Sequence, residues 1–434
     1  MLAVVVLTVL AQWPLVANPG YFSHDELQWA AAANVAPGVA LPWVGWFDLA
    51  LFQYRPLTFN LWLWLSHHLF EQPQAFHAVI VVAGALNTAL LAGLLMRLQA
   101  SPRRAVLTAL VFALGPYAMY VHGWVGTIGD LLWVGCALLV GWVATSRQAG
   151  WKIAIAAGVL TVVALLAKEA ALSIPALLAV AWALDRARGG WRWALLGSAP
   201  PALAYLLLRL SVLAGAGEAE TFYAWSLANI PQRWLEYHAF VPQVSVFEAQ
   251  VTLARGLGDT RFVVSCLLVL TLLAALWRVG WRWAVALLAG GAAALGPVLV
   301  LAGAGNQYGY GFAAFTAGLV ACAWPRLARW GRGVVVVLAV LSLWHGINVM
   351  RQVRQVGEMQ AVFSPALAGL LRDGDAGIVR LRIAEEVPQW IFQRLTHDIP
   401  SYDGVPIGSR VQLVGPGEAA DRVIQADGQL APVP

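Results

Sequence analysis

Long runs of apolar residues alternate with short polar segments along most of the chain. A run of roughly 17–25 apolar residues can cross the ~30 Å hydrocarbon core of a bilayer. The pattern therefore predicts an all-α polytopic membrane protein of about eleven transmembrane helices. These helices are expected at residues 2–18, 76–96, 104–121, 128–145, 152–167, 169–184, 193–212, 262–277, 283–302, 310–324 and 333–350.

Two long segments interrupt this pattern, and a third region ends it. Residues 19–75 form a first long loop, in which the apolar stretch at 57–70 is too short to span and predicts an interfacial helix. Residues 213–261 form a second long loop. The membrane domain is expected to cover 1–354, followed by a small soluble α+β domain at 355–434. Alternating apolar and polar residues predict strands there at 377–383, 409–415 and 421–427.

Composition agrees with a chain surrounded mostly by lipid. Of the 434 residues, 60% are apolar and 11% are charged, whereas soluble domains carry about 25% charged residues. The net charge of +5 comes from dispersed short clusters, so no nucleic-acid partner is expected. Cys136, Cys266 and Cys322 lie inside apolar runs without paired spacing, which indicates buried apolar side chains rather than a disulfide or metal site.

The distribution of basic residues predicts the orientation in the membrane. With the amino terminus inside, thirteen Lys and Arg residues fall in short cytoplasmic loops and most acids fall outside. An odd number of spans then leaves the carboxyl terminus outside. Residues 1–16 lack the basic segment and cleavage site of a signal peptide, so they read as the first span. No Lys or Arg precedes Arg55, which is unusual for a cytoplasmic terminus and suggests a natural start upstream.

The sharpest candidate for chemistry is the acidic pair Asp25-Glu26 in SHDELQW, directly after the first span. Charged groups at a membrane boundary are costly unless they are solvated, paired or used. One interpretation is a general base in a cleft at the membrane surface. The alternative is a pair of solvated carboxylates, or a helix cap that follows Ser23.

Further charged residues lie at other span boundaries. Arg55 stands near the end of the first loop, and Lys168-Glu169 separates two apolar spans. A Lys between two apolar spans is costly, so Lys168 is expected to pair with Glu169 or with an anionic ligand. A phosphate is a candidate ligand, because a Lys or Arg can stabilise charge on a phosphate leaving group. Asp130 enters the fourth span and either belongs to the same site or caps that helix.

Two remaining groups of polar residues have less specific patterns. Tyr308 lies in the segment Asn306–Tyr310, a turn with interfacial tyrosines or a further part of a binding site. The histidines at positions 67, 68, 77 and 122 lack metal-ligand spacing with the acids, and are expected to be satisfied interfacial residues.

Four of these places, in this order, resemble the GT-C class of membrane glycosyltransferases, and especially the protein O-mannosyltransferases and the transmembrane, tetratricopeptide-bearing mannosyltransferases. The acidic pair follows the first span, and YRPLTFN (54–60) precedes the second. Pro116 and Trp124 precede DLL (130–132), and ALLAKEAALSIPALL (164–178) is similar to the family's lysine–glutamate stretch. The resemblance covers roughly residues 1–185 and, more weakly, 300–325.

The resemblance implies an enzyme that takes a sugar from a polyprenyl phosphate at the outer face and inverts the anomeric centre. Asp25, with Glu26 as its rival, is then the base, and Arg55 and Lys168 lie near the donor phosphate. No metal or other cofactor is implied. The acceptor is expected to be an envelope glycan, a lipid or a protein. Richness in Ala, Trp and Arg, without an N-x-S/T sequon, favours a bacterial inner membrane.

The chain also departs from the family pattern. Ala118 and Tyr120 occupy positions where the family has histidine and glutamate, and Ile128 and Gln307 replace two arginines. These departures keep open a catalytically inactive scaffold subunit of the same fold. A transporter or lipid flippase is a further alternative, although such proteins place polar groups near mid-membrane in repeated halves, and here the ionisable residues gather at one surface.

Overall fold

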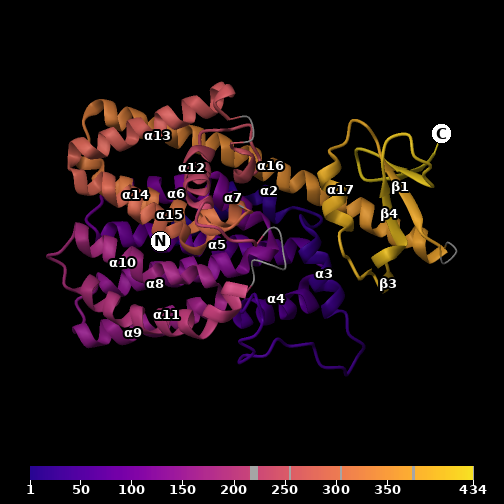
Figure 1. The fold of residues 1–434 in the computed structure, drawn as a ribbon, viewed down its shortest axis with the longest axis horizontal. Helices are drawn as coiled ribbons and strands as arrows, with labels where there is room; N and C mark the ends of the chain where they lie inside the picture. The colour runs from indigo at the N-terminus through magenta and orange to yellow at the C-terminus, as the bar shows by residue number, and fades with distance from the viewer. Residues whose placement is uncertain (216–222, 254–255, 304, 374–376, 434) are drawn as a thin grey trace.

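The computed structural model describes residues 1–215, 223–253, 256–303, 305–373 and 377–433. Most of these residues are helical, and the helices pack side by side in a bundle from which the last helix of the membrane part, α16, extends toward a small sheet region (Figure 1). The helices of the bundle run in layers in this view, with α9 and α11 on one side and α13 and α14 on the other.

Most of the long helices begin and end close to the predicted apolar runs, although α16 continues well beyond the predicted end at residue 350. In chain order they are α1 (Leu2–Ala11), α2 (Trp13–Val16), α3 (His24–Ala33), α4 (Pro56–Leu69), α5 (Pro73–Arg97), α6 (Pro102–Ala113), α7 (Pro116–Gly123), η1 (Val125–Thr127), α8 (Ile128–Ala144), α9 (Gly150–Ala167), η2 (Glu169–Leu172), α10 (Ser173–Leu184), α11 (Gly190–Gly215), α12 (Asn229–Phe240), α13 (Thr260–Val279), α14 (Trp281–Leu295), η6 (Gly296–Val300), η7 (Asn306–Tyr308), α15 (Gly309–Ala323), α16 (Arg329–Asp373) and α17 (Gln389–Thr396).

Within the described residues, seven helices are long and apolar enough to cross a membrane. They are α5, η1 with α8, α9, α11, α13, α14 with η6, and α16. The chain is thus a mostly helical membrane protein, but the predicted number of eleven spans is not confirmed. Three of the other predicted segments hold a short apolar helix or a broken pair of helices.

The broken segments have local causes. The predicted first span is interrupted at Gln12, so α1 covers only ten residues. The predicted third span consists of α6 and α7, which meet at an angle of 61°. Pro116 follows Gly115 at this bend, and proline cannot donate the backbone hydrogen bond that would continue a helix. Counted as one span, this bent pair raises the number from seven to eight.

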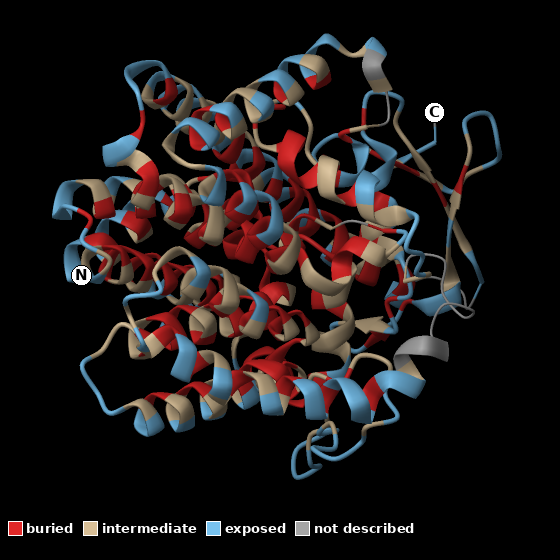
Figure 2. Ribbon diagram, turned by 60° about the vertical axis from the view of Figure 1, so that its left-hand side comes forward, coloured by how far each residue is buried: buried red, intermediate tan, exposed pale blue. Residues whose placement is uncertain are grey.

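The outer surface of the bundle supports the membrane assignment. Buried residues gather toward the interior of the bundle, whereas the outward faces of the peripheral helices are exposed (Figure 2). Many of these outward residues are large and apolar, on a scale that water-soluble proteins rarely show. On α9, α11, α13 and α16 they include Ile155, Val159, Leu203, Leu207, Leu208, Leu210, Leu267, Leu270, Val336 and Val340.

The two predicted loops contain helices of their own. In the first loop (19–75), α3 follows directly after the first apolar segment, and α4 coincides with the interfacial helix expected at 57–70. In the second loop (213–261), α12 is amphipathic, and residues 216–222 and 254–255 lie outside the described residues. The described parts of both loops lie toward the end of the bundle that carries the sheet region, called the loop end below (Figure 1).

The sheet region contains the expected strands. Those predicted at 377–383, 409–415 and 421–427 are confirmed as β1 (Val379–Ile383), β4 (Val411–Val414) and β5 (Arg422–Ile424). With β6 (Leu430–Pro432) they form a sheet in the order β4-β1-β5-β6. Strand β1 is parallel to β4 and β5, and β6 is antiparallel to β5. A separate hairpin joins β2 (Ser401–Tyr402) and β3 (Val405–Pro406).

One helix connects the bundle to the sheet region. Helix α16 continues without a break from Arg329 to Asp373, so the predicted domain boundary at 354/355 falls inside it. Beyond that boundary α16 still packs on the first loop, where Gln360 accepts a hydrogen bond of 2.8 Å from the Tyr21 amide. A Cβ added to Gly20 would lie 2.2 Å from the Gly357 carbonyl oxygen, so backbones touch here.

Helix α16 also approaches the α6–α7 bend closely. A Cβ added to Gly346 would lie 1.8 Å from the Leu114 carbonyl oxygen, a backbone atom that cannot move aside alone. Small residues let membrane helices approach in this way. The bend and α16 therefore fit together only because position 346 is glycine.

We predict that Gly346→Ala lowers the melting temperature of the protein in detergent, because overpacking costs about 1–3 kcal/mol. Gly333→Ala is the matched control, since Gly333 lies in the same helix and an added Cβ there meets nothing within 4 Å. That variant should melt at the same temperature or slightly higher. Equal melting temperatures for the two variants would contradict the close approach.

Candidate functional site

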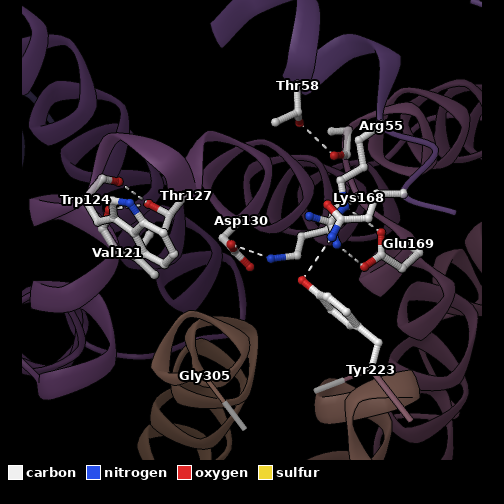
Figure 3. A network of polar contacts seen from close by, with 12 residues as sticks. Arg55, Thr58, Val121, Trp124, Thr127, Asp130, Lys168, Glu169, Tyr223 and Gly305 are labelled. Carbon is white, nitrogen blue, oxygen red and sulfur yellow. Dashed lines mark hydrogen bonds and ion pairs between the residues drawn. The ribbon is translucent and has the colours of Figure 1, made fainter. Parts of the chain in front are cut away.

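Two ion pairs, each between residues from distant segments of the chain, lie at the loop end of the bundle. Figure 3 shows their side chains from close by. Lys168 Nζ lies 2.5 Å from Asp130 Oδ2. Arg55 donates from Nε to Glu169 Oε2 over 2.7 Å and from Nη2 to Glu169 Oε1. The expected pairing of Lys168 with its neighbour Glu169 is therefore corrected: each of these residues pairs with a residue from a distant segment.

The local backbone explains why Lys168 and Glu169 pair with different segments. Helix α9 ends at Ala167, and Lys168 adopts an extended conformation with φ −162° and ψ 138° before η2 begins. Successive side chains of an extended backbone point in opposite directions. Lys168 consequently points toward α8 and Glu169 toward the start of α4, where Arg55 precedes Pro56 in the first helical position.

Asp130 lies in the first turn of α8 and serves as the partner of Lys168. The residue before α8 is Thr127, and no side chain caps this helix, so the alternative that Asp130 is a helix cap is wrong. The neighbouring Gly129 allows α8 to approach the end of α9, because an added Cβ would lie 3.0 Å from the Ala167 carbonyl oxygen. Thr58 of α4 donates to the same carbonyl over 2.7 Å.

Two tyrosines complete this cluster. The ring of Tyr308 lies 4.8 Å from Lys168 Nζ, an arrangement that attracts the ammonium group to the aromatic face. Tyr223, which the sequence did not single out, accepts a hydrogen bond of 2.9 Å from Gln53. Burial raises the pKa of the Tyr223 hydroxyl; the Arg55 charge opposes this shift, and the charges of Glu169 and Asp25 add to it. Tyr223 thus lies within electrostatic reach of the Arg55–Glu169 pair and of Asp25.

The ion pairs are buried, although not equally. The side chains of Lys168 and Asp130 are 5% and 3% exposed, whereas those of Arg55 and Glu169 are 14% and 25% exposed. Burial alone would lower the pKa of Arg55, but the charge and hydrogen bonds of Glu169 raise it above its ordinary value. Removing one member of a buried pair typically costs 3–5 kcal/mol because an uncompensated charge remains. The Arg55–Glu169 pair is therefore the one within reach of a ligand from solvent.

The acidic pair of the first loop divides into two different environments. Glu26 is 1% exposed, and its carboxylate accepts backbone hydrogen bonds from Phe22, Ser23 and Val125 over 2.6, 2.8 and 2.9 Å. Together with Ser23 it forms a capping box at the start of α3. Burial raises the pKa of Glu26 to about 8, against these three hydrogen bonds. The helix-cap alternative therefore describes Glu26, and its role as a rival base stays a prediction.

Asp25 remains accessible. Its side chain is 32% exposed and lies 2.9 Å from the ring of His24. It belongs to the same loop end as Tyr223 and lies within electrostatic reach of Arg394 in α17. Of the acidic pair, Asp25 is thus the residue that a substrate can contact.

The histidines were predicted to be interfacial, and two of them lie deeper. His77 and His122 are fully buried. His77 contacts the Gly20 carbonyl over 2.9 Å, and His122 contacts Gln12 over 2.9 Å. His67 and His68 lie at the carboxyl end of α4 as expected. In the described part of the chain, no group of three or more His, Cys, Asp or Glu residues is arranged to hold a metal ion.

In comparisons with protein-family models, with curated proteins and with solved structures, the chain has no match. The function must therefore be argued from the residues of the site themselves.

We predict that Glu26→Gln destabilises the protein by about 1–3 kcal/mol, the cost of a buried donor left without an acceptor. Both carboxyl oxygens of Glu26 accept backbone hydrogen bonds, and a glutamine amide nitrogen cannot replace one of them. Asp25→Asn is the matched control and should leave the melting temperature nearly unchanged, because Asp25 is partly exposed. The reverse order of melting temperatures would refute the capping role.

Proposed function

We propose that this protein is a membrane glycosyltransferase of the GT-C type, which transfers a sugar from a polyprenyl phosphate to an acceptor at the periplasmic face of a bacterial inner membrane. The amino terminus is then cytoplasmic and the carboxyl terminus periplasmic, so that the loop end faces the periplasm. The acceptor is an envelope glycan, a lipid or a protein.

One observation carries this proposal. Residues from separate family-like motifs meet in a single cluster, although more than a hundred positions separate Arg55 from Glu169. Asp130 joins them through Lys168, and Tyr308 from the last of these segments packs on Lys168. Two cations, each paired with a carboxylate, and the accessible Asp25 lie at the same end of an apolar bundle, which suits a substrate with a lipid chain, a phosphate and a sugar.

The proposed reaction is a direct displacement. The acceptor hydroxyl oxygen attacks the anomeric carbon, its proton passes to Asp25, and the bond between that carbon and the phosphate oxygen breaks. The polyprenyl phosphate leaves with the electron pair, and the anomeric centre is inverted. Cations beside the phosphate stabilise the developing charge. A guanidinium has five N–H donors, and Glu169 takes two of those of Arg55.

The charge balance favours a second candidate, the inactive scaffold subunit. Arg55 and Lys168 are each paired with a carboxylate, so the four side chains together carry no net charge. A donor phosphate must share these cations with Glu169 and Asp130. The vesicle assays below separate the candidates, because a scaffold transfers no sugar from any donor, and a flippase moves lipid across the membrane without transfer.

The first test concerns the cations. In vesicles supplied with radiolabelled polyprenyl-phosphate hexoses, Arg55→Ala and Lys168→Ala should both raise the donor KM more than Arg233→Ala does. For Arg55→Ala the rise should be about 10–100-fold, which corresponds to the loss of one charge-assisted hydrogen bond of about 1.5–3 kcal/mol. Arg233→Ala is the matched control, because Arg233 forms a buried ion pair with Glu236 in the second loop. Equal and small KM changes in the three variants would mean that Arg55 and Lys168 are only structural.

The second test concerns the base. Asp25→Asn should lower transfer by on the order of 10² or more, because a positioned general base typically contributes 10²–10⁴-fold. Asp48→Asn provides a control, since Asp48 is an exposed carboxylate of the same loop. If Asp25→Asn retains its activity, the base has to be sought at Glu169 or Asp130.

A further inference from the structure

Helix α17 of the C-terminal region lies against the start of α3, next to Asp25. Arg394 donates from Nε to Ser23 Oγ over 3.3 Å, and Ser23 is the residue that caps α3. Its Nη1 lies 4.0 Å from Glu248 Oε1 in the second loop. The Arg394 side chain thus contacts both loops of the site, and it is only 18% exposed.

Aromatic rings hold this guanidinium in place. Its carbon Cζ lies 4.5 Å from the ring centroid of Phe22 and 5.6 Å from that of Trp124. Both distances are within the roughly 6 Å over which a cation is attracted to an aromatic face. Burial alone would lower the pKa of Arg394, but its interaction with Tyr120 and the charges of Glu248 and Asp25 raise that pKa above its ordinary value. Arg394 is therefore a fixed charge at the junction.

Apolar side chains of α17, including Ile391, Phe392 and Leu395, also pack into the main core, whereas the remaining polar contacts across this junction are more exposed than Arg394. Gln28 donates to the carbonyl oxygens of His397 and Asp398 over 3.3 and 3.1 Å, at the surface. The rings of His24 and His397 meet edge to face at 5.1 Å. Surface contacts of this kind contribute little stability. Arg394 is the partly buried charged side chain of α17 at this contact.

We propose that Arg394 is a positioning residue: it fastens α17 to the amino end of α3 and so holds Asp25 in place, which makes the C-terminal region an integral part of the site. The inference rests on the proposed function for the role of Asp25, but the fastening itself does not depend on it. Displacement of α3 by a small distance would move the base away from the acceptor, and such shifts are costly for catalysis.

The test uses a full-length chain in which Cys136, Cys266 and Cys322 are replaced by alanine and cysteines are placed at Gln28 and Asp398. A short bismaleimide should link the two positions rapidly when Arg394 is present. Arg394→Gln should slow the linking about tenfold, the effect of losing about 1.4 kcal/mol of contact. Arg372→Gln is the matched control, because Arg372 forms an exposed ion pair with Asp403 in the same region, and linking should not change.

Transfer of radiolabelled hexose is measured in the same vesicles before and after linking. Arg394→Gln should transfer about tenfold more slowly than the parent, with a larger change in kcat than in the donor KM, and prior linking should restore the parental rate. Unchanged linking in Arg394→Gln would overturn the fastening. If Arg394→Gln is linked more slowly, as expected, but completed linking does not restore transfer, the positioning role would be overturned in favour of direct contact between Arg394 and the substrate. A parent without any transfer would refute the proposed function, while the linking rates would still decide the fastening.

Discussion

Placing four charges inside an apolar bundle is the constraint on which this site depends. A buried charge is tolerated only when a partner compensates it, and here the partners come from segments that are far apart in the chain. Lys168 and Glu169 can each reach a different partner because the backbone between α9 and η2 is extended at that point. The two pairs thereby connect α4, α8 and the break after α9. The same contacts that satisfy the charges also hold these three segments together.

This neutrality has a functional consequence. A site that binds a phosphate diester benefits from excess positive charge, yet Arg55 and Lys168 are both compensated in the structure. The two pairs differ in exposure, and the more exposed Arg55–Glu169 pair is the one that a phosphate oxygen can approach. Lys168, enclosed between Asp130 and the Tyr308 ring, is better suited to fixing the geometry. The phosphate contact is therefore expected to fall first on Arg55, with Lys168 acting behind it.

Sequence reasoning predicted the type of protein better than the details of its elements. Apolar runs identify helices, but they do not reveal where a helix is interrupted. The segment that bends at Pro116 and the segment that breaks at Gln12 therefore each look like a single span in the sequence. The candidate residues Arg55 and Lys168 could be named because charge is rare between apolar segments. Their partners could not be assigned, because a pairing across a bundle depends on backbone direction. Glu26 and Asp25 are adjacent in sequence, and only their burial separates a structural acid from an accessible one.

The contact of Arg394 with the first loop could not be predicted from the pattern of apolar and polar residues. It lies in a short amphipathic helix of a region that reads as a separate soluble domain, and nothing in its neighbourhood of the sequence points to the first loop. The link is made by α16, which continues through the predicted boundary and packs on Tyr21 through Gln360. Because a continuous helix transmits position over its whole length, the sheet region is anchored at a fixed place beside α3. The C-terminal region consequently adjoins the site, since the contact of Arg394 with Ser23 lies two residues from the proposed base.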